Sequence, residues 1–136
     1  MKFITKFLLL AVFSINSSHA EWIPYANNTD RTMILYYQNL SLGKKDEYTT
    51  VLIRKNFKTA KEVILDDKKI IYKSVINKQL IDCDKNRYAT TEVVMYEKWD
   101  AEGEKLYTTI MNKLNWNSVK KNSVQEGLME KVCFRV

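Results

Sequence analysis

The sequence predicts an α+β fold in which about six antiparallel strands form a meander and a C-terminal helix packs against the sheet. Three observations lead to this prediction. Most of the chain consists of runs rich in Val, Ile, Thr and Tyr, separated by short polar turns. The end of the chain instead has the pattern of a capped helix. The chain also contains two cysteines, which one disulfide can join.

The first element is a predicted secretory signal peptide at residues 1–20. It opens with Lys2 and Lys6, continues through an apolar run, and closes with Ser18 and Ala20 at the −3 and −1 positions of a cleavage site. The alternative is an uncleaved membrane anchor, but the apolar run is shorter than the roughly 20 residues that span a bilayer. Cleavage would leave residues 21–136 as a single domain without a membrane span.

Strand patterns fill most of the predicted mature chain. The runs lie at 32–38, 48–57, 69–82, 87–99 and 104–111, and the turn signals lie at 27–30, 43–46, 66–67, 84–86 and 100–103. Consecutive strands joined by short turns predict an antiparallel meander. The mixture of apolar and charged positions predicts that one face of the sheet is packed and the other is exposed to solvent.

A short helix is predicted in the segment "NSVQEGLMEKVCFRV" (122–136). Ser123 is followed three residues later by Glu126, which is the spacing of a capping box. Apolar residues then recur at helical spacing, namely Val124, Leu128, Met129, Val132 and Cys133. An exported chain with an even number of cysteines favours a structural disulfide between Cys83 and Cys133, which would tie the middle of the chain to its end.

The predicted mature chain lacks the residues of several enzyme classes. The only histidine, His19, lies in the signal peptide, so a nucleophile paired with histidine and a histidine-ligated metal site are both excluded. We therefore expect no enzymatic activity, no cofactor and no metal. The acidic pairs fall in predicted turns, and a small hydrolase that uses carboxylates alone is the least favoured alternative.

The net charge is positive. Removing residues 1–20 takes two of the 22 basic residues and none of the 16 acidic ones, so the formal net charge falls from +6 to +4. Acidic residues alternate with basic ones, which is typical of a solvated surface, whereas a basic rim for an acidic partner is the functional alternative. We place that hypothetical rim at Arg54, Lys55, Lys73 and Lys78. No nucleic-acid-binding motif is present.

Aromatic residues are frequent and have two interpretations. Tyr and Trp favour sheets, and they also favour interfaces because they combine a large apolar area with a polar tip. The first interpretation assigns them to sheet packing, and the second to a ligand or dimer face.

The order of several short motifs resembles the surface-adhesin protein E family of Gram-negative bacteria. These motifs are Trp22, "ILYYQNLSL", "IIYKSVINKQLIDCDKNRY", Gly103, Trp116 and "SVQEGLMEKVC". The resemblance implies a protein E-like domain over 21–136, with an antiparallel sheet, a flanking helix, bonded cysteines and the capacity to form homodimers. It also implies an adhesin that binds host extracellular-matrix or plasma proteins.

The positions of the cysteines bear on where in the cell the protein is expected to be. No cysteine comes directly after the predicted signal peptide, so we do not expect a lipoprotein. The protein would then be periplasmic, held at the outer surface or secreted. A periplasmic accessory or inhibitor protein that binds another protein is the alternative to an adhesin.

Overall fold

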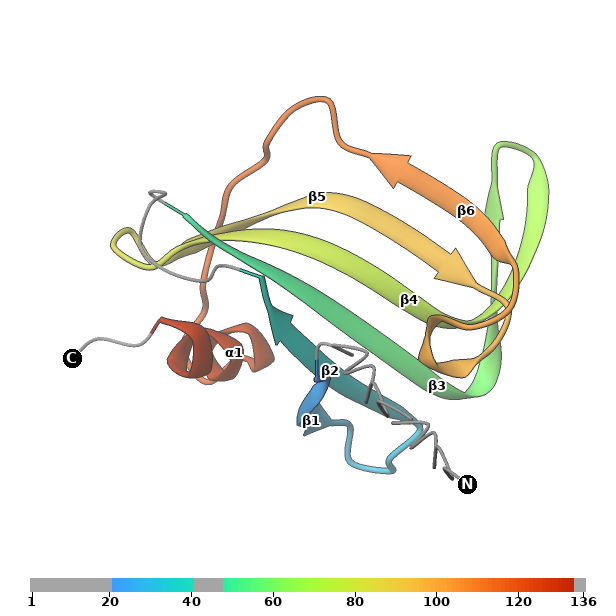
Figure 1. Cartoon of the computed structure of the whole chain (residues 1–136), viewed down its shortest axis with the longest axis horizontal. Helices are drawn as coiled ribbons and strands as arrows, with labels where there is room; N and C mark the ends of the chain where they lie inside the picture. The colour runs from blue at the N-terminus through green and yellow to red at the C-terminus, as the bar shows by residue number, and fades with distance from the viewer. Residues whose placement is uncertain (1–20, 41–47, 134–136) are drawn as a thin grey trace, which may run out of the picture.

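The computed structural model describes residues 21–40 and 48–133 and confirms the predicted α+β fold (Figure 1). Six strands follow one another in chain order: β1 (Ile23–Asn27), β2 (Met33–Asn39), β3 (Thr49–Leu65), β4 (Lys68–Asp82), β5 (Arg87–Tyr96) and β6 (Lys105–Ile110). A two-residue strand, β7 (Asn117–Ser118), and the helix α1 (Val124–Val132) complete the described part. The predicted signal peptide and the predicted turn at 43–46 lie outside the described residues.

The sheet is an antiparallel meander. Each of the six strands pairs with the next one along the chain, and β7 adds to β5 beside Arg87 and Tyr88. Strands β3 and β4 form the longest hairpin, and their turn consists of Asp66 and Asp67, both with positive φ (51° and 61°). Two consecutive left-handed residues match the twist of a two-residue hairpin, and Asp adopts this conformation more readily than most residues.

Strand β3 extends further than the predicted run at 48–57. It reaches Leu65 because its pairing with β4 shifts between Asn56 and Lys61 and then resumes. Such a bulge inserts extra residues and bends the strand without ending the sheet. Strand β5 is shorter than predicted: it ends at Tyr96, and Trp99 lies in a separate 3-10 turn, η1 (Trp99–Ala101).

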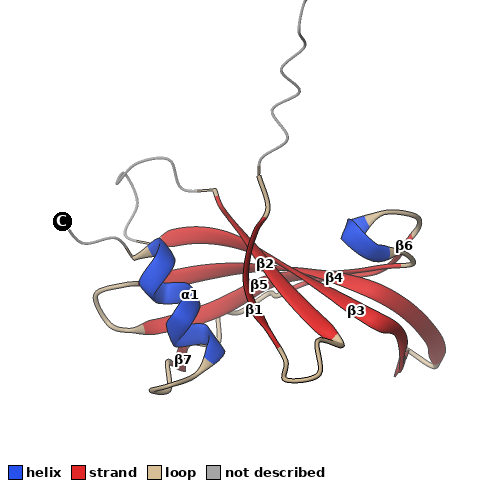
Figure 2. Ribbon diagram, turned by 90° about the horizontal axis from the view of Figure 1, so that it is seen from below, coloured by secondary structure: helices blue, strands red, loops and turns tan. Residues whose placement is uncertain are grey.

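The main hydrophobic core lies between α1 and one side of the sheet, which we call the helix face. Val51, Ile53 and Ile81 from the sheet pack with Leu128 and Met129 from the helix, and all are buried. Burying one such side chain stabilises the fold by about 1.5–3 kcal/mol. Figure 2 shows α1 and the 3-10 turn at opposite ends of the sheet. The helix therefore covers only part of the sheet.

The helix begins as predicted. The Ser123 hydroxyl accepts a hydrogen bond from the backbone N–H of Glu126 at 3.2 Å, which satisfies one of the free donors of the first turn. The Glu126 carboxylate accepts from the N–H of Asn122, also at 3.2 Å, rather than from that of Ser123. The carboxylate thus reaches one residue further back than a standard capping box requires.

The opposite side of the sheet, which we call the loop face, differs from the prediction. A solvent-exposed face was expected, yet Arg54 and Asn56 are only 8% and 6% exposed and Ser74 is fully buried. The expectation is wrong at this part of the face because the segment 97–104, which we call the η1 loop, contacts β3 and β4 there. A tertiary contact of this kind leaves no periodic signal in the strands that it covers.

Candidate functional site

The four predicted basic residues do not form one rim. Arg54 pairs with Ile76, and alternate residues of a strand point to opposite faces, so Arg54 and Lys78 lie on the loop face and Lys55 on the helix face. Lys73 is exposed beside the β3 bulge, and its Nζ lies 5.9 Å from the centroid of a Trp99 ring. The structure therefore brings Arg54 and Lys73 close to the η1 loop and separates Lys55 from them.

Two of these cations, Lys55 and Arg54, are shielded from solvent, with different consequences for each. Burial lowers the pKa of the Lys55 ammonium, which is half-buried on the helix face. The Arg54 guanidinium lies over two aromatic rings, with its carbon 4.8 Å from the Trp22 ring centroid and 4.5 Å from that of Tyr36. Its Nη2 lies 3.0 Å from Oδ1 of Asp100. Arg54 thus joins the residue that precedes β1, strand β2 and the η1 loop.

The η1 loop is fixed to the sheet by side chains from β3 and β4. The Asn56 amide donates to Oδ1 of Asp100 at 2.7 Å, and its oxygen accepts from the backbone N–H of Asp100 at 3.0 Å. The Ser74 hydroxyl donates to the carbonyl of Lys98 and accepts from the N–H of Ala101. These bonds satisfy polar groups that the loop buries, which is why a buried Asn and Ser are tolerated here.

The same loop depends on unusual backbone conformations. Asp100 and Ala101 have positive φ (61° and 58°), and Gly103 follows with φ 77°. A Cβ at Gly103 would lie 3.1 Å from side-chain atoms of Glu97 and Lys98. Both the positive φ and this close contact therefore favour glycine at this position.

A cleft of about 460 Å³ opens on the loop face between the turn that joins β1 to β2, strands β2 and β3, and the η1 loop. We call it the Trp99 cleft. It is lined by two cations, two aromatic residues, an aliphatic residue and three polar residues: Arg31, Lys58, Tyr36, Trp99, Ile34, Thr32, Asn56 and Asp100. Its volume is in the range of binding pockets in proteins.

Hydrogen bonds hold the walls of the Trp99 cleft in place. The indole Nε1 of Trp99 donates to the carbonyl of Phe57. The N–H of Lys58 donates to the carbonyl of Thr32 at 2.7 Å, which joins the β1–β2 turn to β3. Hydrogen bonds from Thr32 hold the pKa of Asp30 below its usual value, and the charge of Lys58 adds to this effect.

A second cluster of aromatic and charged residues lies at the other end of the sheet. Burial alone would raise the pKa of Asp82, but the Nε of Arg87 donates at 2.9 Å and the N–H of Lys85 at 3.1 Å, so the pKa lies below its usual value. The Arg87 guanidinium carbon lies 4.3 Å from the Trp116 ring centroid, which is itself 5.0 Å from that of Tyr48. This cluster connects the β4–β5 turn to the segment before β7.

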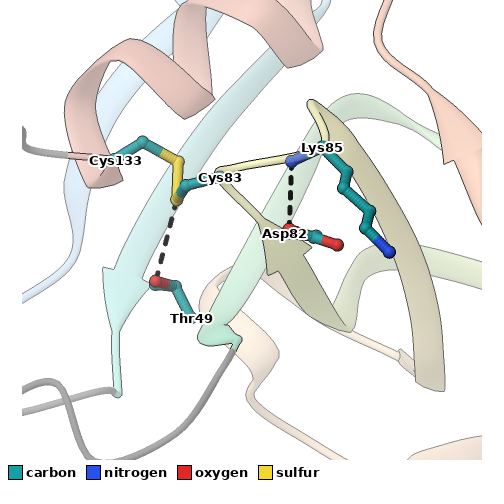
Figure 3. The surroundings of a disulfide bond; sticks show 5 residues. All are labelled: Thr49, Asp82, Cys83, Lys85 and Cys133. Carbon is teal, nitrogen blue, oxygen red and sulfur yellow. Dashed lines mark hydrogen bonds between the residues drawn. A yellow bond between two sulfur atoms is a disulfide. The ribbon is translucent and has the colours of Figure 1, made fainter.

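The predicted disulfide is present. Cys83 and Cys133 are bonded, with Cα atoms 5.6 Å apart and 50 residues of separation along the chain. Figure 3 shows the bond joining the end of α1 to the β4–β5 turn. The Thr49 hydroxyl lies 3.9 Å from Sγ of Cys83. Several motif residues of the resemblance thus have structural roles: Ser74 fixes the η1 loop, Asp82 and Arg87 form a partly buried ion pair, and the cysteines attach the helix.

Sequence reasoning did not find the Trp99 cleft. It placed Trp99 within a strand and named neither Arg31 nor Lys58 as site residues. The turn signal at 27–30 was the one available clue, since Arg31 ends that turn with a positive φ of 57°. Nothing in the local pattern indicates that this turn and the η1 loop meet across the sheet.

Two further observations concern the described ranges 21–40 and 48–133. They contain no helix with the length and apolar character needed to cross a membrane. Within them, no three His, Cys, Asp or Glu side chains are grouped so that they could hold a metal ion.

Comparisons with a family model and with solved structures point to the same protein family and fold. The family model of surface-adhesin protein E matches residues 22–134. Haemophilus influenzae protein E is similar in structure, with a TM-score of 0.58 and 11% identity over 82% of this chain and 83% of that one. A second crystal form of the same protein gives a TM-score of 0.57 and 10% identity over 82% and 86%.

At these identities the two structures show a shared fold. A comparison with curated protein sequences gives no match. The family model, however, covers most of the chain and nearly all of the described residues. The chain belongs to the surface-adhesin protein E family.

Proposed function

We propose that the protein is an exported, non-enzymatic adhesin that binds host proteins of the extracellular matrix or the plasma. The observation that carries this proposal is the family match over residues 22–134. The disulfide is consistent with export, because such bonds form and persist in oxidising compartments.

The chemistry of the Trp99 cleft supports binding rather than catalysis. Its carboxylate, Asp100, pairs with Arg54 and accepts a hydrogen bond from Asn56, and these contacts give it a structural role in holding the η1 loop. The only histidine lies at position 19, within the predicted signal peptide. The site therefore offers aromatic faces and positive charge, which are properties of a recognition surface.

The predicted basic residues contribute to binding in different ways under this proposal. Lys73 and Lys78 would attract an acidic partner directly from the exposed and half-buried positions that they occupy on β4. Arg54 would act by holding Trp22 and Tyr36 in place, since its own charge is paired with Asp100. Lys55, on the other face, would contribute only to the overall positive potential.

A binding measurement with the purified exported protein tests this function. Immobilised extracellular-matrix and plasma proteins are presented as a panel, and binding is followed at low and high salt. We expect at least one member to bind, with affinity that falls as salt rises, and the Lys73→Glu/Lys78→Glu variant to bind about tenfold more weakly.

The matched control is Lys113→Glu/Lys120→Glu, which changes the net charge equally at two exposed positions outside strands β1–β6. Equal binding by both double variants would contradict a role for Lys73 and Lys78. A panel with no bound member would contradict the adhesin proposal and direct attention to a periplasmic protein partner.

A further inference from the structure

The Trp99 cleft has the composition of a binding hot spot. Residues that dominate the energetics of protein interfaces are enriched in Trp, Tyr and Arg and lie in well-formed pockets. The cleft contains one of each, Trp99, Tyr36 and Arg31. Trp99 is 46% exposed although its indole N–H is hydrogen-bonded, so its apolar surface remains available to a partner.

The charges of the cleft favour a negatively charged partner group. Arg31 and Lys58 are exposed, and no acidic side chain in the described part of the chain lies within ion-pair distance of either one. The exposed Asp30 carboxylate is affected by the charge of Lys58 but does not form an ion pair with it. The carboxylate of Asp100 does not neutralise them, because it is paired with Arg54. A carboxylate from outside would therefore find two available cations beside an aromatic wall.

The cleft is also preorganised. The turn that carries Arg31 is fixed by the Asn28 side chain, which donates to the Thr32 hydroxyl at 2.6 Å and accepts from the N–H of Met33 at 3.0 Å. Asn56 fixes the η1 loop on the opposite side. A partner that binds here would not have to order these walls, and this lowers the entropic cost of association.

We propose that the Trp99 cleft anchors an acidic segment of the partner protein, with an Asp or Glu carboxylate between Arg31 and Lys58 and an adjacent apolar side chain against Trp99. This inference rests on the proposed function in one respect: it assumes that the partner is a protein. It adds the place of contact and the chemistry that the partner must present.

A peptide titration tests the chemistry independently of any host protein. The probe is the capped peptide acetyl-Gly-Leu-Asp-Glu-Leu-Gly-amide, and the control is the same peptide with Asn and Gln in place of Asp and Glu. We expect the acidic peptide, at millimolar concentration, to shift the NMR amide signals of Arg31, Thr32 and Lys58 and the indole signal of Trp99. The control peptide should leave them in place.

The variant Arg31→Glu/Lys58→Glu tests the site in the protein. Both side chains are exposed, so we expect the thermal unfolding of this variant to match that of the wild type. Peptide-induced shifts should disappear, and binding to the host protein identified in the panel should weaken about tenfold or more, because like charges now face each other. Lys113→Glu/Lys120→Glu again serves as the charge-matched control.

The outcomes separate this inference from the proposed function. If the acidic peptide shifts the NMR signals but no protein of the host panel binds, the result would support the proposed role of the cleft and contradict the adhesin proposal. Host binding that is unchanged in Arg31→Glu/Lys58→Glu would overturn the inference while leaving the adhesin proposal intact. Glucuronic acid is titrated in parallel as a third probe. NMR shifts caused by glucuronic acid but not by the acidic peptide would also overturn the inference, in favour of a site for acidic sugars.

Discussion

The Asp100 carboxylate should be the most important charge for the stability of the loop face. We consider Asp100→Asn, which removes the charge but keeps the size of the side chain and its tolerance of the positive φ of 61°. The substitution leaves the guanidinium of Arg54, whose side chain is 10% exposed, without a counter-ion. It also weakens the hydrogen bond that Asn56 donates at 2.7 Å.

The expected cost follows from these contacts. Breaking a fully buried ion pair costs about 3–5 kcal/mol, and a hydrogen bond to a charged group contributes about 1.5–3 kcal/mol. The Asp100 side chain is 51% exposed, so water replaces part of the lost interaction. We therefore expect the free energy of unfolding to fall by about 2 kcal/mol, which lowers the midpoint of urea denaturation by roughly 1 M.

Glu62→Gln is the matched control. It removes the charge of an ion pair with Lys69 whose Oε1–Nζ distance is 3.2 Å, but both side chains are more than half exposed. Exposed pairs of this kind contribute about 0–1 kcal/mol. If Asp100→Asn lowered the free energy of unfolding no more than Glu62→Gln does, the argument that Arg54 depends on Asp100 would be refuted.

Three other predictions concern the rest of the fold. Reducing the disulfide should lower the free energy of unfolding by roughly 4 kcal/mol in the chain-entropy model for a loop of 50 residues, measured by denaturation with and without reductant; an unchanged midpoint would contradict this. The lowered pKa of Asp82 means that its contribution is present above the unfolded-state pKa of about 3.9 and is lost as pH falls through the folded-state value. Asp82→Asn should accordingly destabilise the protein at pH 7 and flatten the pH dependence below pH 5, whereas curves that stay parallel to the wild type would exclude the carboxylate as the cause. Gly127→Ala should raise the free energy of unfolding by about 0.5–1 kcal/mol, because the new Cβ would meet no other part of the protein within 4 Å beyond the neighbouring backbone of the helix, and a loss of stability would contradict this.

Local sequence patterns were sufficient to locate strands β2 to β6 and the helix, and the disulfide followed from the even number of cysteines in a chain predicted to be exported. Alternating Val, Ile and Thr define strands, and a Ser three residues before a Glu defines a helix start, because each signal depends on neighbouring residues. Strand β1 was missed because its five residues include Pro24 and Ala26, which do not favour sheets. The full length of β3 was missed because the bulge interrupts its alternation.

The candidate site depends on contacts that the sequence does not show. Asn56 and Asp100 are 44 residues apart, and their hydrogen bonds determine where the η1 loop lies. We expected Arg54 to be an exposed cation because it lies in a strand with other polar residues. In the structure, two aromatic rings and Asp100 contact its guanidinium instead. Distant contacts between polar residues have no periodicity, so a pattern in one strand cannot predict them.

Protease accessibility in intact cells tests the central claim, that the protein is a surface adhesin, most directly. The full chain is expressed, intact cells are treated with protease, and the treatment is repeated after the outer membrane has been permeabilised. A parallel digestion of the purified, disulfide-bonded protein establishes that the same protease cuts the folded domain. Our account predicts digestion on intact cells, whereas protection until permeabilisation would place the protein in the periplasm and contradict the adhesin proposal.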